Sequence, residues 1–395
     1  MRFCCVETRV RDAAGWARAR SGSRSGGRGH DLQSRRCWRF QGPAGDGGQA
    51  MVSGDTGEVR LGQAAGSGAM ASRMRVIAAD VGGTYARLGL VERVGDGLRI
   101  GFHRRYECAG FSSLAALLQR FRHEAEAAGE RDIPDVGVVA IAGVLEGDDL
   151  RNGNLAWPVS LAATRREAGI AQLYLINDFE ALAWALPQLP PAQFQPLGDV
   201  TGLPRPVLLI GPGTGLGAAL LAEVEGRTVV QPSEAGQAAL AAGTPLELEV
   251  VRRLQARFGH VASERVFSGP GLVTLYQALC ALRDAAPRWN TPAELVAAAD
   301  AGQDPLAAEA VALLCAWLGS FAGDLALIFR ARSVCLAGGL AGHLRRHLRE
   351  GDFMRRFCDK GVLSESLRRV SVQALAHGDL GLLGAAAWYA AHPDA

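Results

Sequence analysis

The sequence is almost without lysine: among 42 basic residues the only lysine is Lys360. A P-loop requires a lysine inside its glycine loop, a protein kinase requires one early in the chain, and a Schiff-base enzyme requires one in its pocket. These mechanisms are therefore excluded. Any phosphate that this chain handles must be bound by backbone amides, by arginine or by a metal ion.

The chain also lacks paired cysteines and a membrane-length apolar run. Its eight cysteines include no C-x-x-C pair and no zinc-ligand spacing, which favours a reducing cytoplasm and cysteines that act as small apolar side chains. The longest uncharged apolar stretch, Ala310–Gly323, is too short to cross a bilayer and is predicted to form a buried helix. With 395 residues, 48% of them apolar, we expect a globular protein of two domains.

Residues 1–73 differ in composition from the rest of the chain. They hold 12 basic and 6 acidic residues, whereas residues 74–395 hold 30 basic and 34 acidic ones. A basic, Arg/Ser-rich segment is compatible with a nucleic-acid-binding arm or a transit peptide. The favoured interpretation is a disordered extension, or upstream sequence included through a wrongly assigned start site, because an apolar strand pattern begins only at Met74.

A glycine turn follows the first predicted strand. Arg75–Ala79 and Arg87–Val91 read as strands on either side of Asp80–Thr84, whose sequence is DVGGT. Glycines leave the backbone of such a hairpin open to close approach by a ligand. An aspartate before the glycines and a threonine hydroxyl after them would frame a metal-bound phosphate, although a hairpin turn with an incidental aspartate fits the same pattern.

Two further glycine sites follow predicted strands. Val207–Ile210 precedes the loop Gly211–Gly217, GPGTGLG, and a third strand pattern at Ala218–Ala222 follows it. The loop lacks the G-x-G-x-x-G spacing and leads into a strand, so a dinucleotide fold is disfavoured, and two such hairpins suggest two related domains facing one nucleotide. After the strand Ser333–Leu336, glycines 338 and 339 would leave room for adenine, or form only a tight strand-to-helix turn.

The stretch Leu173–Pro187, LYLINDFEALAWALP, places Asn177 and Asp178 between a buried strand and an Ala/Leu-rich helix. Open α/β sheets bind ligands at the carboxyl ends of their strands, which makes Asp178 a candidate catalytic carboxylate. A short acidic side chain at this position would also serve as the N-cap of the helix. The two roles are compatible.

These motifs occur together with several more specific ones. They are DVGGT at Asp80, INDF at Ile176, GPGTGLG at Gly211, GHVASERVFSGPGL at Gly259, LAGGL at Leu336 and GLLGAA at Gly381. From about Met74 to Ala391 the chain resembles the bacterial ATP-dependent glucokinases, members of the actin-like sugar kinase superfamily.

The resemblance implies an α/β, two-domain actin-like (ribonuclease H-like) sugar kinase fold with a central cleft. It implies a small domain of residues 74–187 plus 379–395, and a large domain of residues 188–378. The implied activity is phosphorylation of the 6-hydroxyl of glucose with ATP and Mg²⁺, the entry to glycolysis. A cytoplasmic homodimer that binds glucose and ATP, but neither nucleic acid nor membrane, is expected.

The resemblance also implies roles for individual residues. Asp178 matches the general base, which orients the sugar hydroxyl and takes its proton as the phosphorus bond forms. The implied sugar contacts are Asn154, Asn177, Glu234, Gln237 and Glu264. The implied nucleotide contacts are Asp80, Gly82, Gly83, Thr84, Gly213, Thr214, Gly215, Gly338 and Gly339, with Asp80 as the metal ligand. For Glu264 the alternative is a surface salt bridge with Arg265.

Three positions depart from the family pattern. Gln237 stands where a histidine is typical, and it can form hydrogen bonds but cannot become a cation. Tyr85 replaces a small polar residue and Val144 replaces proline. We interpret these changes as clustered on the sugar side, which predicts intact phosphotransfer with altered sugar affinity.

The sequence is compatible with alternatives to a glucokinase. A catalytically weak sugar sensor and a kinase for another hexose remain open. A related repressor and kinase family is disfavoured because the sequence has neither a Cys/His zinc motif nor a helical pattern in residues 1–73.

Overall fold

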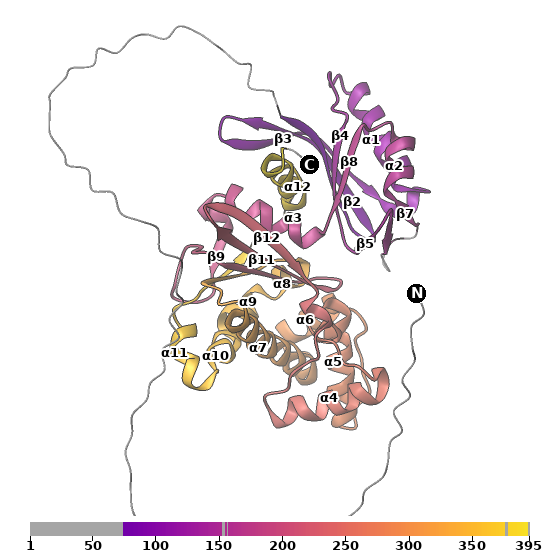
Figure 1. Cartoon of the computed structure of the whole chain (residues 1–395). Coiled ribbons are helices and arrows are strands. Elements are labelled where there is room, and N and C mark those ends of the chain that lie inside the picture. The colour runs from indigo at the N-terminus through magenta and orange to yellow at the C-terminus, as the bar shows by residue number, and fades with distance from the viewer. Residues whose placement is uncertain (1–73, 152–154, 156, 376–377, 394–395) are drawn as a thin grey trace, which may run out of the picture. The chain divides into compact units, whose positions relative to one another are not determined.

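The computed structural model describes residues 74–151, 155, 157–375 and 378–393 (Figure 1). The predictions for residues 1–73 and for Asn154 lie outside these ranges. The described residues belong to one compact unit.

The first sheet has five strands in the order β3-β2-β1-β4-β8. They are β1 (Arg75–Val81), β2 (Tyr85–Val94), β3 (Gly97–Glu107), β4 (Val136–Ile141) and β8 (Gln172–Ile176). β1, β2 and β3 form an antiparallel meander, and β4 and β8 run parallel to β1. The small sheet β5 (Val144–Glu146), β6 (Asp149–Arg151) and β7 (Val159–Ser160) lies between β4 and β8 in the sequence.

Both faces of the first sheet are covered by helices. Ile77 and Ala79 of β1 face a core that includes residues of α1 (Leu114–Ala127) and α2 (Leu161–Ala168). Val76 and Ala78 point the other way and pack with α12 (Leu380–Ala391), the last helix of the chain. Alternate burial along the strand therefore brings residues from the two ends of the described chain into one core.

The second sheet has six strands in the order β12-β11-β10-β13-β14-β9. They are β9 (Phe194–Pro196), β10 (Val207–Pro212), β11 (Leu216–Val224), β12 (Arg227–Ser233), β13 (Ser333–Leu336) and β14 (Ser371–Leu375). β10, β11 and β12 form an antiparallel meander, and β13 and β14 run parallel to β10. The first sheet has the same plan, and both predicted glycine hairpins are confirmed.

Apart from α3 (Asp178–Ala185), which precedes the second hairpin, the remaining α-helices follow that hairpin. They are α4 (Pro245–Phe258), α5 (Gly269–Leu282), α6 (Pro292–Asp300), α7 (Pro305–Ile328), α8 (Gly339–His343), α9 (Arg345–Glu350), α10 (Phe353–Cys358) and α11 (Ser364–Leu367). Local sequence explains several of their first turns. Thr244 and Thr291 each form a capping box with a glutamate three residues later, and Pro245 and Pro292 occupy the next position, where no backbone donor is needed.

The apolar helix predicted around residues 310–323 is α7, which is longer than that stretch. Its 24 residues are, by length and composition alone, long and apolar enough to cross a membrane, whereas the uncharged stretch Ala310–Gly323 within it is shorter. The prediction of a buried helix is confirmed, because 61% of its apolar window is buried inside the protein. Gly319 and Gly323 let α10 approach, since a Cβ there would lie 2.2 and 2.4 Å from backbone oxygens of Phe353 and Phe357.

A buried ion pair fastens α4 to α10. Glu247 is fully buried, and its carboxylate accepts bonds of 2.7 and 3.2 Å from both terminal nitrogens of Arg356. The backbone amides of Gly243 and Thr244 donate to the same carboxylate. Both oxygens of the buried Glu247 carboxylate therefore have hydrogen-bond donors, as a buried charge requires.

The cysteines and the single lysine have structural roles in the described chain. Cys108, Cys280, Cys315 and Cys335 are buried free thiols, as predicted, and Cys358 is half-buried. Lys360 forms an ion pair with Asp324 at 2.8 Å. Cys4, Cys5 and Cys37 lie outside the described residues.

Candidate active site

The Asn-Asp pair lies at the point where β8 ends and α3 (Asp178–Ala185) begins. The N-cap is Asn177, whose Oδ1 accepts the backbone amides of Phe179 at 2.9 Å and Glu180 at 3.1 Å. The suggestion that Asp178 caps the helix is therefore wrong, because the preceding residue already fills that role. Asp178 is the first helical residue and keeps partial solvent access.

The Asp178 carboxyl is electrostatically unusual. Its pKa is raised from 3.8 to about 6, chiefly because protein atoms surround it, and further because the negative charges of Asp80 and Glu234 lie nearby. The backbone amide of Phe179 opposes the shift by donating to Oδ1 at 3.0 Å. A carboxylate of raised pKa that solvent can still reach suits proton abstraction near neutral pH.

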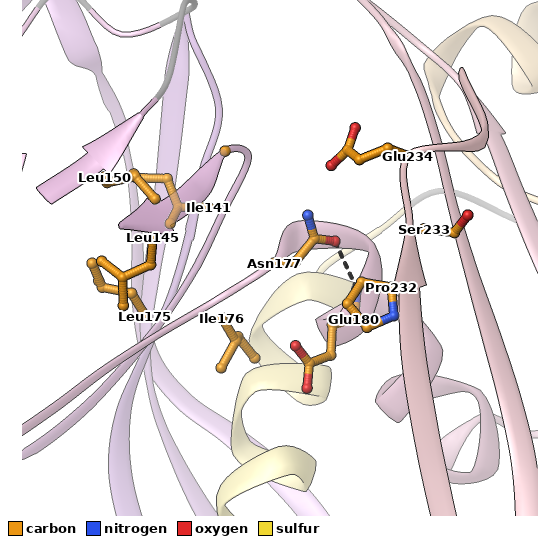
Figure 2. A pocket seen from close by; sticks show the side chains of 11 residues that line it. Ile141, Leu145, Leu150, Leu175, Ile176, Asn177, Glu180, Pro232, Ser233 and Glu234 are labelled. Atoms are coloured by element: carbon orange, nitrogen blue, oxygen red, sulfur yellow. Dashed lines mark hydrogen bonds between the residues drawn. The ribbon is translucent and has the colours of Figure 1, made fainter. Parts of the chain in front are cut away.

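A pocket of about 250 Å³ lies beside this helix (Figure 2). Asn177, the N-cap of α3, and Glu180 lie between an apolar wall, contributed by the first sheet and the small sheet, and the segment Pro232–Glu234 at the end of β12. The apolar wall consists of Ile141, Leu145, Leu150, Leu175 and Ile176. The pocket thus combines an apolar side with the polar groups that fix a small ligand.

Glu180 is a pocket residue that sequence reasoning missed. Burial raises the pKa of its carboxyl, which accepts a hydrogen bond of 3.1 Å from Nε1 of Trp388 on α12. Its position one helical turn from Asn177 was readable from the sequence. The contact with Trp388 was not, because the two residues are 208 positions apart.

Three candidate sugar contacts are brought together beside the second hairpin. Oε2 of Glu264 accepts the backbone amide of Leu216 at 2.9 Å, and Oε1 lies 3.4 Å from Nε2 of Gln237. Gln237 closes the short turn that follows Glu234. The alternative salt bridge between Glu264 and its neighbour is not found among the described residues.

The first hairpin forms as the sequence predicts. β1 and β2 pair from residue 75 to residue 92, and the turn Gly82–Thr84 is closed by a 3.0 Å bond from the amide of Gly82 to the carbonyl of Tyr85. Gly82, Gly83 and Thr84 are exposed. Tyr85 begins β2 directly after this turn, so its departure from the family pattern lies beside the candidate nucleotide turn.

Asp80 lies near the end of β1, close to the start of α12. A Cβ on Gly381 would lie 2.5 Å from Cγ of Asp80, so only glycine admits the carboxylate there. Arg87 lies 3.6 Å from Asp80 and 3.8 Å from Asp379, longer than hydrogen bonds.

The arrangement around Asp80 fits Mg²⁺, which is usually held by one or two carboxylates together with water and substrate phosphates. No group of three or more metal-binding side chains occurs in the part of the chain that the structure describes. A single carboxylate is therefore compatible with a metal that arrives with its substrate.

The second hairpin presents Thr214 at an exposed tip. The amide of Gly213 donates to the carbonyl of Gly215 at 2.8 Å, and the amide of Gly269 donates to the carbonyl of Gly213 at 2.8 Å. A Cβ on Gly215 would lie 2.5 Å from Oε2 of Glu264. The candidate nucleotide turn therefore directly contacts a candidate sugar residue.

Phe179 fixes α3 against the second hairpin. Its ring lies over two glycines that are paired across β10 and β11, where added Cβ atoms would lie 2.2 Å from the ring at Gly211 and 2.0 Å at Gly217. Only glycine leaves this space. Phe179, the residue next to Asp178, therefore packs on the two strands that carry the second glycine turn.

The third glycine site requires glycine for a similar reason. Gly338 has a φ of 93°, and a Cβ there would lie 2.6 Å from the carbonyl oxygen of Pro212. Gly339 begins α8 and faces open space. A tight strand-to-helix turn and an open surface are therefore both present after β13.

The two sheets share one plan, and each carries a glycine hairpin. The helix that bears the Asp178 carboxyl packs against both sheets, and this arrangement defines an actin-like sugar kinase. The chain matches the family model described as Glucokinase over residues 77–392. The chain belongs to the glucokinase family.

Individual relatives agree with this assignment. The chain is 40% identical to a glucokinase-like protein of Xylella fastidiosa, a match that covers 79% of this chain and 94% of the relative. It is 37% identical to a glucokinase of Nitrobacter hamburgensis, covering 79% and 96%. Among solved structures, a glucokinase from an Antarctic psychrotroph superposes with a TM-score of 0.70 at 31% identity, covering 80% of this chain and 98% of that one.

Proposed function

We propose that this protein transfers the terminal phosphoryl group of ATP to the 6-hydroxyl of glucose, giving glucose 6-phosphate and ADP. Membership of the glucokinase family makes it an ATP-dependent hexose kinase. The observation that carries the proposal is the Asp178 carboxyl, with a pKa raised to about 6, on a helix seated against the second glycine hairpin.

Asp178 acts as the general base. The 6-hydroxyl donates a hydrogen bond to its carboxylate, the hydroxyl oxygen attacks the terminal phosphorus, and the proton passes to Asp178 as the bond from phosphorus to ADP breaks. Because Asn177 already caps α3, the Asp178 carboxylate is not required for capping. The N-terminal turn of α3 also favours the negative charge.

The sugar is held by amide and carboxylate groups around the pocket. Asn177 uses its oxygen in the helix cap, so its NH₂ group can donate to a sugar hydroxyl. Glu234, Gln237 and Glu264 accept or donate hydrogen bonds on the opposite side. Asn154 is proposed as a further sugar contact, although it lies outside the described residues.

The nucleotide phosphates are bound by the turns Gly82–Thr84 and Gly213–Gly215, and the adenine lies against Gly338 and Gly339. Asp80 would hold Mg²⁺, which supplies neutralisation of phosphate charge when bound. The backbone amides of these turns can donate hydrogen bonds to the charged phosphate oxygens. The phosphate can approach closely because no side chain projects from the glycines.

The division into a small domain of residues 74–187 plus 379–395 and a large domain of residues 188–378 is part of this proposal. It is supported by the separate sheets that these ranges contain. We also propose a cytoplasmic homodimer. The expectation that neither nucleic acid nor membrane is a partner stays a prediction.

The test is a coupled assay of glucose 6-phosphate formation by the full chain, run beside Asp178→Asn and the matched control Asp96→Asn in the exposed β2-β3 turn. We expect activity in the wild type and the control, and a loss of at least a hundredfold in Asp178→Asn, in the range of general-base catalysis. Mannose, fructose and glucosamine, assayed through ADP release, define the sugar range.

Calorimetric titration with glucose separates binding from chemistry. Asp178→Asn should still bind glucose, because Asn177 and the glutamates remain. If the wild type binds glucose but phosphorylates no hexose, the protein is a sugar sensor and not a kinase. Full activity in Asp178→Asn would remove Asp178 from the mechanism.

A further inference from the structure

Tyr85, a departure from the family pattern, has an arginine side chain stacked on its ring. Tyr85 is 38% exposed, and the guanidinium carbon of Arg105 on β3 lies 3.7 Å from the centroid of its ring. Such stacking orients a guanidinium while leaving its N–H groups at the edge able to donate. Tyr85 is also the residue whose carbonyl closes the turn Gly82–Thr84.

The strand register places Arg105 in a charged row. Asp80, Arg87 and Arg105 are paired position by position across β1, β2 and β3, so their side chains share one face of the sheet. This is the face on which α12 packs, and Asp379, just before α12, lies 3.8 Å from Arg87. The row therefore runs from the candidate metal ligand to the edge strand.

Arg87 and Arg105 lie directly opposite each other, an arrangement of like charges that is unfavourable in an antiparallel pair. Arg87 is partly compensated by two aspartates. Arg105 forms no ion pair among the described residues, and its guanidinium stacks on the tyrosine ring. A bound anion would relieve the repulsion between the two guanidinium groups.

The end of β3 is tied to the glycine turn. The amide of Cys108 donates to the carbonyl of Thr84 at 2.9 Å, and the Cys108 thiol lies 3.2 Å from the carbonyl oxygen of Gly82. The strand that carries Arg105 is thus held beside the turn that would bind phosphate. The chain has no lysine to offer there, since Lys360 is paired with Asp324.

We propose that Arg105, seated on the ring of Tyr85, contacts the polyphosphate of the nucleotide bound at the turn Gly82–Thr84. The inference rests on the proposed function for the location of the nucleotide. It adds a cation that the glycine turns do not supply, and it gives the tyrosine at position 85 a role. The ligand group is a di- or triphosphate and not a monophosphate, because a monophosphate carries less negative charge with which to interact with the arginines of the charged row.

The test compares Arg105→Gln with Arg104→Gln. Arg104 is the matched control because it lies next in the chain, points to the opposite face and stacks on Phe102 at 4.1 Å. We expect Arg105→Gln to raise the KM for ATP about tenfold, the effect of losing one charge-assisted contact, with the KM for glucose within about twofold of wild type. Arg104→Gln should leave both constants unchanged.

Direct binding keeps the inference separate from the kinase activity. Calorimetry with ATP and with AMP should show weaker binding of ATP but not of AMP to Arg105→Gln. Tyr85→Asn should cause part of the same loss, and the double variant should lose less than the product of the two single effects because both remove one contact. The salt dependence of ATP binding should be shallower in Arg105→Gln.

The outcomes are distinguishable. A wild type that binds ATP without phosphorylating any hexose refutes the proposed function while the binding comparison still decides on Arg105. ATP binding by Arg105→Gln equal to that of wild type overturns the inference and leaves the kinase intact. Equal losses of ATP and AMP binding would also overturn it, because they would indicate a general change in the site.

Discussion

Replacing Asp178 by asparagine is predicted to stabilise the protein while it lowers activity at least a hundredfold. The pKa of Asp178 is raised from 3.8 to about 6 by burial and by the charges of Asp80 and Glu234. A shift of about two units corresponds to about 3 kcal/mol between the two protonation states. The folded chain therefore carries an ionised group that its surroundings disfavour.

The sign of the effect follows from the two pKa values. Below pH 3.8 the carboxyl is protonated in the folded and the unfolded chain, so it does not affect stability. Between pH 3.8 and about 6 only the unfolded chain releases the proton, and the free energy of unfolding falls as pH rises. Above pH 6 the loss is complete and constant.

The side-chain amide of the Asp178→Asn variant would remain neutral at every pH. This variant should thus exceed wild type in free energy of unfolding by about 3 kcal/mol at pH 7.5 and by about 1 kcal/mol at pH 4.5. For a protein of this size the larger value corresponds to a rise in Tm of roughly 5 °C. Urea denaturation and thermal melts without nucleotide, sugar or Mg²⁺ measure both differences.

Asp96→Asn, in an exposed turn, is the control and should change stability little at either pH. An Asp178→Asn variant that is no more stable than wild type at pH 7.5 would refute the reasoning. A stability difference that does not shrink between pH 7.5 and pH 4.5 would also refute it, because the cause would then not be ionisation.

Three further predictions follow from the site and its support. The value of kcat/KM should fall below pH about 6 and be about tenfold lower at pH 5, because the base must be ionised; a flat profile would exclude Asp178 as the titrating base. Gln237→His should lower the KM for glucose several-fold with the KM for ATP unchanged, and an unaltered KM in steady-state kinetics would show that the glutamine is harmless. Arg356→Met should cost about 3–5 kcal/mol in chemical denaturation, because it leaves the fully buried Glu247 without its partner, and adding Glu247→Leu should recover much of the loss.

The hairpins were predictable from the sequence because the signal for them is local. Gly82, Gly83 and the glycines of GPGTGLG lie between short apolar runs, and such runs joined by a glycine turn are a short-range signal for a hairpin. The helix cap was less readable. Asn177 and Asp178 are both good N-cap residues, and only the residue at which β8 ends decides between them.

The contacts that complete the site were not predictable, because they join residues distant in the sequence. Nothing near Phe179 indicates that its ring lies on Gly211 and Gly217. The stacking of Arg105 on Tyr85 likewise depends on the register between β2 and β3. Sequence patterns indicate the candidate groups, whereas the strand register and the packing determine which of them are in contact.

The position of α12 has a consequence for the order in which the protein can be completed during synthesis. Val76 and Ala78, made near the start of the described chain, bury their side chains against Leu382 and Ala385, made near its end. A ribosome must therefore translate past Ala385, more than 300 residues after Val76, before one face of the first sheet is covered. Until then a nascent chain exposes an apolar sheet face that neighbouring chains or chaperones can bind.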